Sequence, residues 1–240
     1  MLILKMLTAQ DKNVELATAT GYMTSFYSLF LFAVGSGLTD AIGIYCSQAW
    51  GSKKPEDINR MYLMFKQSML IMAMYYLAVI TPLALFVETF LVNKVGVSVA
   101  VSATSQTLVI YCLPGLFVRS LTDVFKSYAQ AQEITVKLGY FTLFNLAIVP
   151  FYSYLFIITL KLEALGFGLC LLTYECGNVI IALVIFKKYM KPECRTTQLA
   201  LSDKFGWFLC ESTKNSATVF HIYLAYESVT LIISKLHDDS

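Results

Sequence analysis

Four ionisable side chains lie in or at the edge of long apolar stretches of this chain, where a charge is costly. Glu227 and His221 lie in the last stretch, Glu175 in the one before it, and Asp40 closes the first. A carboxylate taken out of water binds a proton more readily, and it attracts cations when charged. An imidazole changes charge near neutral pH. These residues could therefore exchange protons and hold cations inside a membrane.

Each of these residues also has a structural interpretation. Glu175 precedes Asn178 by three residues, which places both on one face of a helix, so the pair either borders a cavity or satisfies itself internally. Glu227 could be satisfied by a neighbour on its own helix. His221 could be a hydrogen-bonded packing residue. Both interpretations remain open at the level of the sequence.

A second charged group has the spacing of an ion pair within one helix. Arg119 and Asp123 are four residues apart, and Lys126 follows three residues later. Side chains at these spacings are neighbours on a helix surface. The sequence predicts a structural ion pair near the cytoplasmic end of that helix.

The elements that carry these residues are defined by gaps between charges. There are 24 uncharged residues between Glu15 and Asp40, 21 between Lys66 and Glu88, 24 between Lys94 and Arg119, and 23 between Lys137 and Lys161. A helix needs about 20 apolar residues to cross a bilayer. Ala164–Phe186, interrupted by Glu175, and the more polar Phe205–Ser234 are fifth and sixth candidates. The predicted fold class is all-α: a polytopic transmembrane helical bundle of about six spans.

Composition excludes several classes of protein. Of 240 residues, 57% are hydrophobic and 14% are charged, whereas soluble domains carry about 25% charged residues. The net charge of +2 and the lack of a basic patch argue against a nucleic-acid partner. No HExxH, GxSxG or nucleotide-binding loop suggests an enzyme. The six cysteines form no CxxC pair, so we expect them to be small packing residues.

Basic residues indicate how the chain crosses the membrane. Eleven of them fall in three alternate connections, four between Lys53 and Lys66, two at Lys126 and Lys137, and five between Lys187 and Lys204. Because cytoplasmic loops are rich in Lys and Arg, these three connections are predicted to be cytoplasmic. The first complete span, roughly Tyr22–Gln48, then runs inwards from outside. Residues 1–20 show neither a signal peptide nor a full span, so we expect an earlier span that this sequence lacks; the alternative is a short tail that crosses unaided.

Several motifs resemble one transporter family. The stretch Gly37–Gly51 reads GLTDAIGIYCSQAWG, which resembles the second helix and following loop of the multidrug and toxic compound extrusion (MATE) family, approximately GLxSAxDTLxxQAYG in eukaryotic members. Leu113-Pro-Gly and Tyr128-Ala-Gln-Ala-Gln resemble the fourth helix. Leu165-Gly-Phe-Gly with Asn178 resembles the sixth, and Ala225-Tyr226-Glu227 resembles the WWAYE stretch of the seventh.

The resemblance runs in order from about Thr8 to Lys235 and implies an architecture. Family members have twelve helices in two six-helix bundles around a central cavity, and this chain resembles helices two to seven. It implies two domains: residues 1–204, similar to the N-terminal bundle without a complete first helix, and residues 205–240, the truncated first helix of the second bundle. A missing second half or a second copy would be needed to close a cavity.

The resemblance also implies a function. Family members are secondary-active antiporters that export xenobiotics or metabolites, typically small amphipathic or cationic compounds, in exchange for protons or sodium, with no cofactor. On this basis Glu227, Glu175, Asp40 and His221 are candidates for proton coupling, and Asn178 and Tyr226 are candidate polar residues of a cavity.

This chain departs from the family pattern at two points. The other glutamate of the seventh helix falls on Ile222, and the paired tryptophans fall on Tyr223 and Leu224. The aspartate expected in the second helix falls on Gly43, so Asp40, three positions earlier, is a displaced substitute. The proton or cation site usually assigned to these positions therefore does not carry over unchanged.

Two alternative functions stay open. One is a lipid-linked oligosaccharide flippase of the same superfamily, whose cavity would need several basic residues; only Arg119 and Lys214 are candidates. The other is a non-transporting, truncated membrane interaction protein. Each interpretation predicts an integral multi-pass protein in a lipid bilayer, in the plasma membrane or in a vacuolar or other internal membrane.

Overall fold

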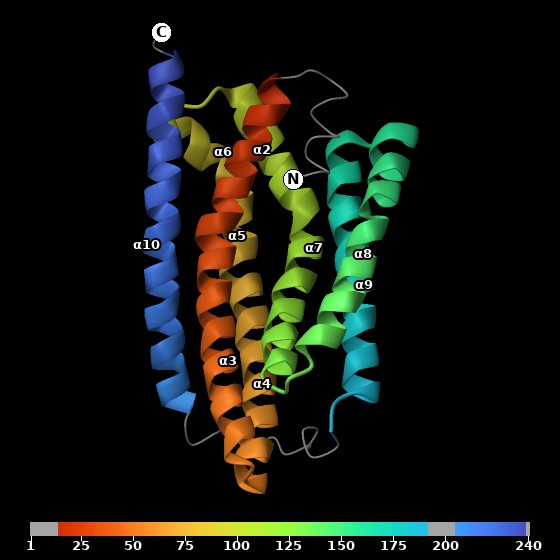
Figure 1. Ribbon diagram of the computed structural model, residues 1–240. Helices are drawn as coiled ribbons and strands as arrows, with labels where there is room; N and C mark the ends of the chain where they lie inside the picture. Colours follow the sequence, from red (N-terminus) through yellow and green to blue (C-terminus); the bar gives the residue numbers. More distant parts are fainter. Residues whose placement is uncertain (1–13, 192–204, 239–240) are drawn as a thin grey trace.

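Long helices in alternating directions form the described part of the chain (Figure 1). The computed structural model describes residues 14–191 and 205–238. The first helix is continuous through α2 (Val14–Tyr27), the π-helical turn η1 (Ser28–Phe32) and α3 (Ala33–Ser52). The return helix comprises α4 (Pro55–Tyr75), η2 (Tyr76–Ile80) and α5 (Thr81–Leu85), followed by the short α6 (Val87–Phe90) and η3 (Leu91–Val95).

The second half of the chain adds four more long segments. They are α7 (Val99–Gln130), α8 (Thr135–Ser153) with η4 (Tyr154–Thr159), α9 (Glu163–Lys188) and α10 (Phe205–Asp238). In the described part of the chain, five helices are long and apolar enough to cross a membrane, namely Leu16–Ser52, Pro55–Leu85, Val99–Gln130, Thr135–Thr159 and Glu163–Lys188. They coincide with the five stronger predicted spans, and the all-α prediction is confirmed. The sixth, α10, is helical but is not among the five.

Local sequence explains where the helices begin and end. The Lys53 backbone is left-handed (φ 55°), which ends α3, and Pro55 opens α4 with Glu56 and Asp57 in its first turn. Proline suits a first helical turn, and acidic residues favour a helix N-terminus. Pro82 lies in the first turn of α5, two residues after the end of η2, whereas Pro114 lies within the unbroken α7. The missing N–H of Pro82 is thus accommodated next to a π-helical turn.

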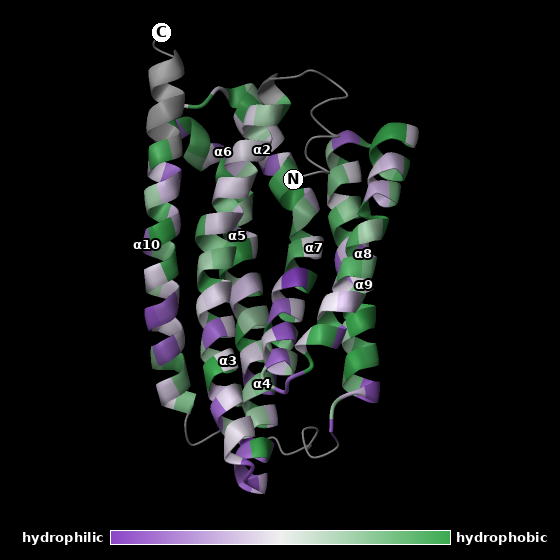
Figure 2. Cartoon of the chain, in the orientation of Figure 1, coloured by the Kyte–Doolittle hydropathy of each residue, from purple (hydrophilic) through white to green (hydrophobic). Residues whose placement is uncertain are grey.

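The basic connections gather at one end of the bundle, at the bottom of Figure 1. The α3–α4 turn, the α7–α8 turn, the end of α9 and the start of α10 all lie there. Figure 2 shows apolar residues along the middle of the helices and polar residues toward this end. The arrangement agrees with the predicted orientation, in which this end is cytoplasmic.

Large apolar side chains cover the outer faces of several helices. Leu70 and Leu77 on the second long helix and Phe144 on α8 are each more than 60% exposed. Such continuous exposure is unusual for a soluble protein and is expected of a surface in contact with lipid. The described chain is therefore a multi-pass membrane protein.

Two clusters of buried side chains share α7. One, toward the basic end, joins α3, α4 and α7 and contains the stacked rings of Phe65 and Tyr128, whose centroids are 4.5 Å apart. The other, toward the opposite end, joins α2, α7 and the region Tyr76–Leu91. Each half of the first helix is thereby fixed against α7.

Glycines allow the closest helix contacts. A Cβ at Gly115 would lie 3.0 Å from the backbone nitrogen of Leu172, so α7 and α9 approach almost backbone to backbone there. A Cβ at Gly37 would collide with Ser216 and lie 2.7 Å from the carbonyl oxygen of Ser212, both on α10. Small residues make such contacts in membranes, where close packing replaces the hydrophobic effect between helices. The helix α10 is therefore seated directly on α3.

The cysteines only partly match the sequence prediction. Cys46, Cys112 and Cys170 are buried among apolar side chains, which confirms the expected packing role. Cys176 and Cys210 are exposed, so the prediction was wrong for these two. They lie on outward faces of α9 and α10, where a weakly polar side chain is tolerated against lipid. Cys194 lies outside the described residues.

Candidate functional site

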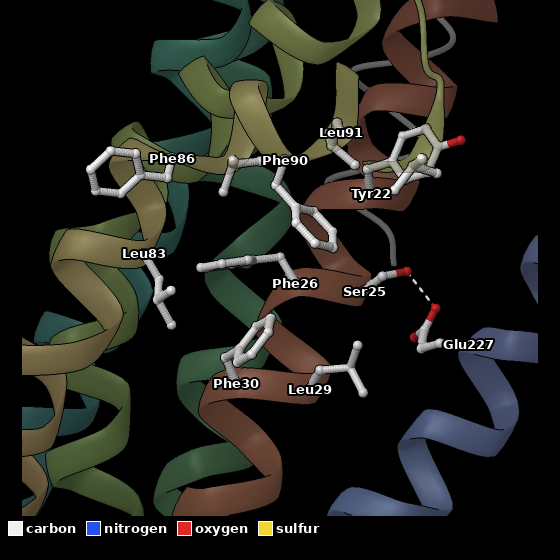
Figure 3. A pocket seen from close by; sticks show the side chains of 12 residues that line it. Tyr22, Ser25, Phe26, Leu29, Phe30, Leu83, Phe86, Phe90, Leu91 and Glu227 are labelled. Carbon is white, nitrogen blue, oxygen red and sulfur yellow. Dashed lines mark hydrogen bonds between the residues drawn. The ribbon is translucent and has the colours of Figure 1, made fainter. Parts of the chain in front are cut away.

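The first candidate site is an apolar cavity at the end of the molecule opposite the basic connections (Figure 3). It measures about 310 Å³ and lies between the first half of the first helix, the region Leu83–Val95 and α10. Its walls are aromatic or aliphatic, formed by Tyr22, Phe26, Leu29, Phe30, Leu83, Phe86, Val87, Phe90, Leu91 and Val95. Its volume is at the lower end of the range of small-molecule sites.

One carboxylate borders this apolar cavity. The hydroxyl of Ser25 on α2 donates a hydrogen bond to Oε2 of Glu227 on α10. Glu227 is the one charged residue among the described residues that line the cavity. A single negative charge beside aromatic rings is the arrangement that binds organic cations, because rings and carboxylate both attract positive charge.

The second candidate site is a buried group of amides around Glu175. Glu175 is 1% exposed, Asn178 3% and Asn145 5%. Nδ2 of Asn178 donates to Oε2 of Glu175 at 2.9 Å, and Nδ2 of Asn145 donates to Oδ1 of Asn178 at 3.0 Å and to the Tyr174 carbonyl at 2.9 Å. The predicted Glu175–Asn178 pair is therefore present, and it continues across to α8.

Charges on α7 surround Glu175 from one side. Arg119, Asp123 and Lys126 all act on it electrostatically. The side that faces α8 is neutral, since Asn145 approaches there. A carboxylate at this depth can gain or lose a proton without moving, because hydrogen bonds and charges already hold it. Glu175 is therefore a candidate for an internal proton site.

The third candidate site is a polar groove toward the basic end, between the first helix and α7. It measures about 550 Å³, and Tyr223 of α10 also lines it. The charged residues in its wall are Arg119, Asp123 and Lys126, and its other polar lining residues are Ser28, Ser36, Thr39, Ser120, Ser127 and Gln130. We call this hollow the polar groove.

The predicted ion pair within α7 lines this polar groove. Nε of Arg119 lies 3.6 Å from Oδ2 of Asp123, and Nζ of Lys126 lies 3.0 Å from Oδ1. The contacts are as predicted from the spacing. The sequence interpretation was incomplete, because it treated the pair as structural and did not anticipate the cavity beside it.

Asp40 lines a neighbouring hollow of about 560 Å³ together with Asn215 of α10. Thr39, Ser127 and Gln130 border both this hollow and the polar groove, so the two are adjacent. Asp40 therefore borders a hollow that adjoins the polar groove. It is not in contact with the Glu227 cavity.

Two of the predicted site residues point away from these cavities. Tyr226 is 70% exposed, and neither it nor the exposed His221 lines any of the three hollows. Glu227 and Glu175 occupy separate places, on α10 and α9 at opposite sides of the bundle. The structure thus groups Glu175 with Asn178. It places Glu227 at the aromatic cavity and Asp40 at a different hollow, with His221 and Tyr226 outside both.

Sequence reasoning missed two polar residues of these sites. Asn145 is an amide within an apolar run, and that exception was the available signal. Ser25 carried no signal, because serine is common in membrane helices and its partner Glu227 lies 202 residues away. Among the described residues, no group of three His, Cys, Asp or Glu side chains is arranged to hold a metal ion.

Comparisons with known proteins agree with this architecture. The family model described as MatE matches residues 2–155. Among solved structures, the fold is similar to that of the eukaryotic MATE transporter AtDTX14, with a TM-score of 0.81 and 19% sequence identity over 96% of this chain. The match covers 50% of that transporter, so the present chain spans about half its length. None of the curated proteins compared with the chain matches it.

Proposed function

Since the chain belongs to the MATE family of membrane transporters, we propose that it acts in a secondary-active antiporter that exports organic cations or other amphipathic compounds in exchange for protons. Sodium is the alternative coupling ion. The observation that carries this proposal is the Glu227 carboxylate, bound by Ser25 at the edge of an aromatic cavity. A proton and an organic cation would compete for this carboxylate.

Competition at one carboxylate couples two fluxes when the site changes access from one side of the membrane to the other only while it is occupied. A cation binds when Glu227 is charged and leaves when it is protonated, so each ligand weakens the binding of the other by the same factor. The aromatic walls add affinity for quaternary or protonated amines without demanding one shape. Glu175, with Asn178 and Asn145, supplies a second proton site in the same chain, and Asp40 a third acidic group nearer the cytoplasmic end.

The flippase alternative is less well supported by the cavity charges. A pyrophosphate group would require several cations, whereas Arg119 and Lys126 share Asp123 and Lys214 pairs with Glu211 on the surface of α10. The antiporter remains our proposal. A non-transporting role corresponds to the outcome in which the chain binds no organic cation.

We first test cation binding to the purified chain in lipid nanodiscs, using benzyltrimethylammonium as the probe. Replacing Glu227 by Gln removes the negative charge and is expected to weaken binding about tenfold, or roughly 1.4 kcal/mol. In the unaltered chain, affinity should fall as pH is lowered, because protons displace the cation; in Glu227→Gln it should be flat.

The matched control is Glu211→Gln, which removes a carboxylate from the same helix outside the cavity. It should leave the affinity and its pH dependence unchanged. Equal binding to the unaltered chain and to Glu227→Gln would refute the cation site. Efflux of the same probe from vesicles under an imposed proton gradient then tests antiport itself. If the unaltered chain binds the probe but shows no efflux, coupling by this chain alone is refuted.

A further inference from the structure

The polar groove differs from the Glu227 cavity in the sign of its charge. In its wall, Asp123 uses Oδ1 for Lys126 and Oδ2 for Arg119. Among the residues that line the groove, one carboxylate thus serves two cations, so the lining carries one positive charge in excess. Glu175, the other carboxylate that acts on these cations, is buried and does not line the groove. A hollow of about 550 Å³ with that charge favours a ligand that brings one negative charge.

Arg119 is held in a position to receive such a ligand. Its Cζ lies 4.5 Å from the ring centroid of Phe32, which covers one face of the guanidinium, and its Nε faces Asp123. A guanidinium has five N–H donors in a planar fork and binds carboxylates well. The side chain of Arg119 is 41% exposed, and that of Lys126 is 26% exposed. Both cations are therefore accessible from the groove.

The remaining walls indicate the rest of the ligand. Leu31, Phe32, Met72 and Tyr223 provide apolar and aromatic surface beside the charges. The excess of a single charge favours a monoanion over a doubly charged phosphate. We propose that the polar groove is a second binding site, for the carboxylate of an amphipathic organic acid, with Arg119 and Lys126 as its anchors.

This site is independent of Glu227. No residue lines both the polar groove and the aromatic cavity. Glu175 influences the groove from behind without lining it. The chain would then accept an organic anion near its basic end and an organic cation near the other, and either site can fail experimentally without the other.

The test measures how tightly three probes of similar shape bind to the purified chain in lipid nanodiscs. The probes are 4-phenylbutyrate, 4-phenylbutan-1-ol and 4-phenylbutylammonium. We expect the carboxylate to bind about tenfold more tightly than the alcohol, with the preference reduced at high salt. Arg119→Gln should lower the affinity for the carboxylate about tenfold and leave the affinity for the ammonium probe unchanged. Equal binding of the carboxylate and the alcohol would overturn the proposal.

Two further variants separate recognition from folding. Asp123→Asn removes the shared carboxylate, so carboxylate binding should tighten several-fold, opposite to Arg119→Gln. If the triad were merely structural, both variants would weaken binding alike, and that result would overturn the proposal. Lys137→Gln is the matched control, because Lys137 also lies over an aromatic ring, 4.1 Å from that of Tyr189, but outside the groove. A loss of carboxylate binding in this control equal to that in Arg119→Gln would also overturn the proposal.

Discussion

At the scale of single residues, the amides around Glu175 are the most constrained polar group in the bundle. Nδ2 of Asn178 donates to Glu175 while its Oδ1 accepts from Asn145. A buried polar group that loses its partner retains the cost of having left water. Asn178 therefore holds the network together from its centre.

Replacing Asn178 by Ala should destabilise the chain by about 1–3 kcal/mol, because Glu175 loses a donor and Asn145 loses an acceptor. Thermal unfolding in detergent, followed by circular dichroism, measures this change. Asn93→Ala alters an exposed amide in the connection before α7 and should leave stability within about 0.5 kcal/mol. Equal stability of the two variants would show that the network contributes nothing to the fold.

The sequence predicted this residue group in part. The three-residue spacing was sufficient to pair Glu175 with Asn178, because helix geometry fixes which side chains are neighbours. Asn145 and Ser25 come from other helices, and their partnerships depend on how helices pack. That information is not periodic in the sequence, and so no spacing indicated either contact.

At the scale of elements, helix contacts are set by where a side chain is missing. The contact of α3 with α10 passes through Gly37, whose hydrogen faces Ser212 and Ser216. Gly43 lies on the same helix, and a Cβ there would meet nothing within 4 Å. These two glycines form a natural pair for a test of the contact.

Gly37→Ala should weaken the packing of α10 against α3 and lower the free energy of unfolding by about 1–3 kcal/mol, because the added methyl group meets backbone atoms that cannot rotate away. Gly43→Ala should be neutral or slightly stabilising. Limited proteolysis of the purified chain before Phe205, followed by gel filtration, reports whether α10 stays associated. Retention of α10 to the same extent in both variants would contradict the role assigned to Gly37.

Element boundaries were harder to predict than elements. The expected first span was Tyr22–Gln48, whereas the helix is continuous from Val14 to Ser52. Charges and hydropathy report the part of a helix inside lipid, about 30 Å thick. Backbone hydrogen bonding continues beyond it, and the end is fixed by the left-handed Lys53 and by Pro55.

At the scale of the whole molecule, the distribution of basic residues predicts an orientation. The α3–α4 and α7–α8 turns, the end of α9 and the start of α10 share one end of the bundle, and the connection that contains Lys94 lies at the other. Charge asymmetry of this kind decides which loops stay in the cytoplasm.

We expect cysteines placed at the two ends to be labelled from opposite sides. In a background with Cys176, Cys194 and Cys210 replaced by Ala, Lys54→Cys should react with a membrane-impermeant maleimide only after the cytoplasmic face is opened. Lys94→Cys should react in intact cells. Labelling of both positions from one side would refute the orientation, and reversed labelling would invert it.

The π-helical turns have a consequence for insertions and deletions during evolution. Each such turn holds one residue more than the α-helical turn it replaces. Losing one residue within Ser28–Phe32 would restore α-helical bonding there and leave Ser25 and Thr39, on either side of the turn, on their present faces. The same loss in the middle of α7 would rotate every later side chain by about 100°. The π-helical turns of the long helices are therefore places where chain length can change by one residue while the helix on either side keeps its present faces.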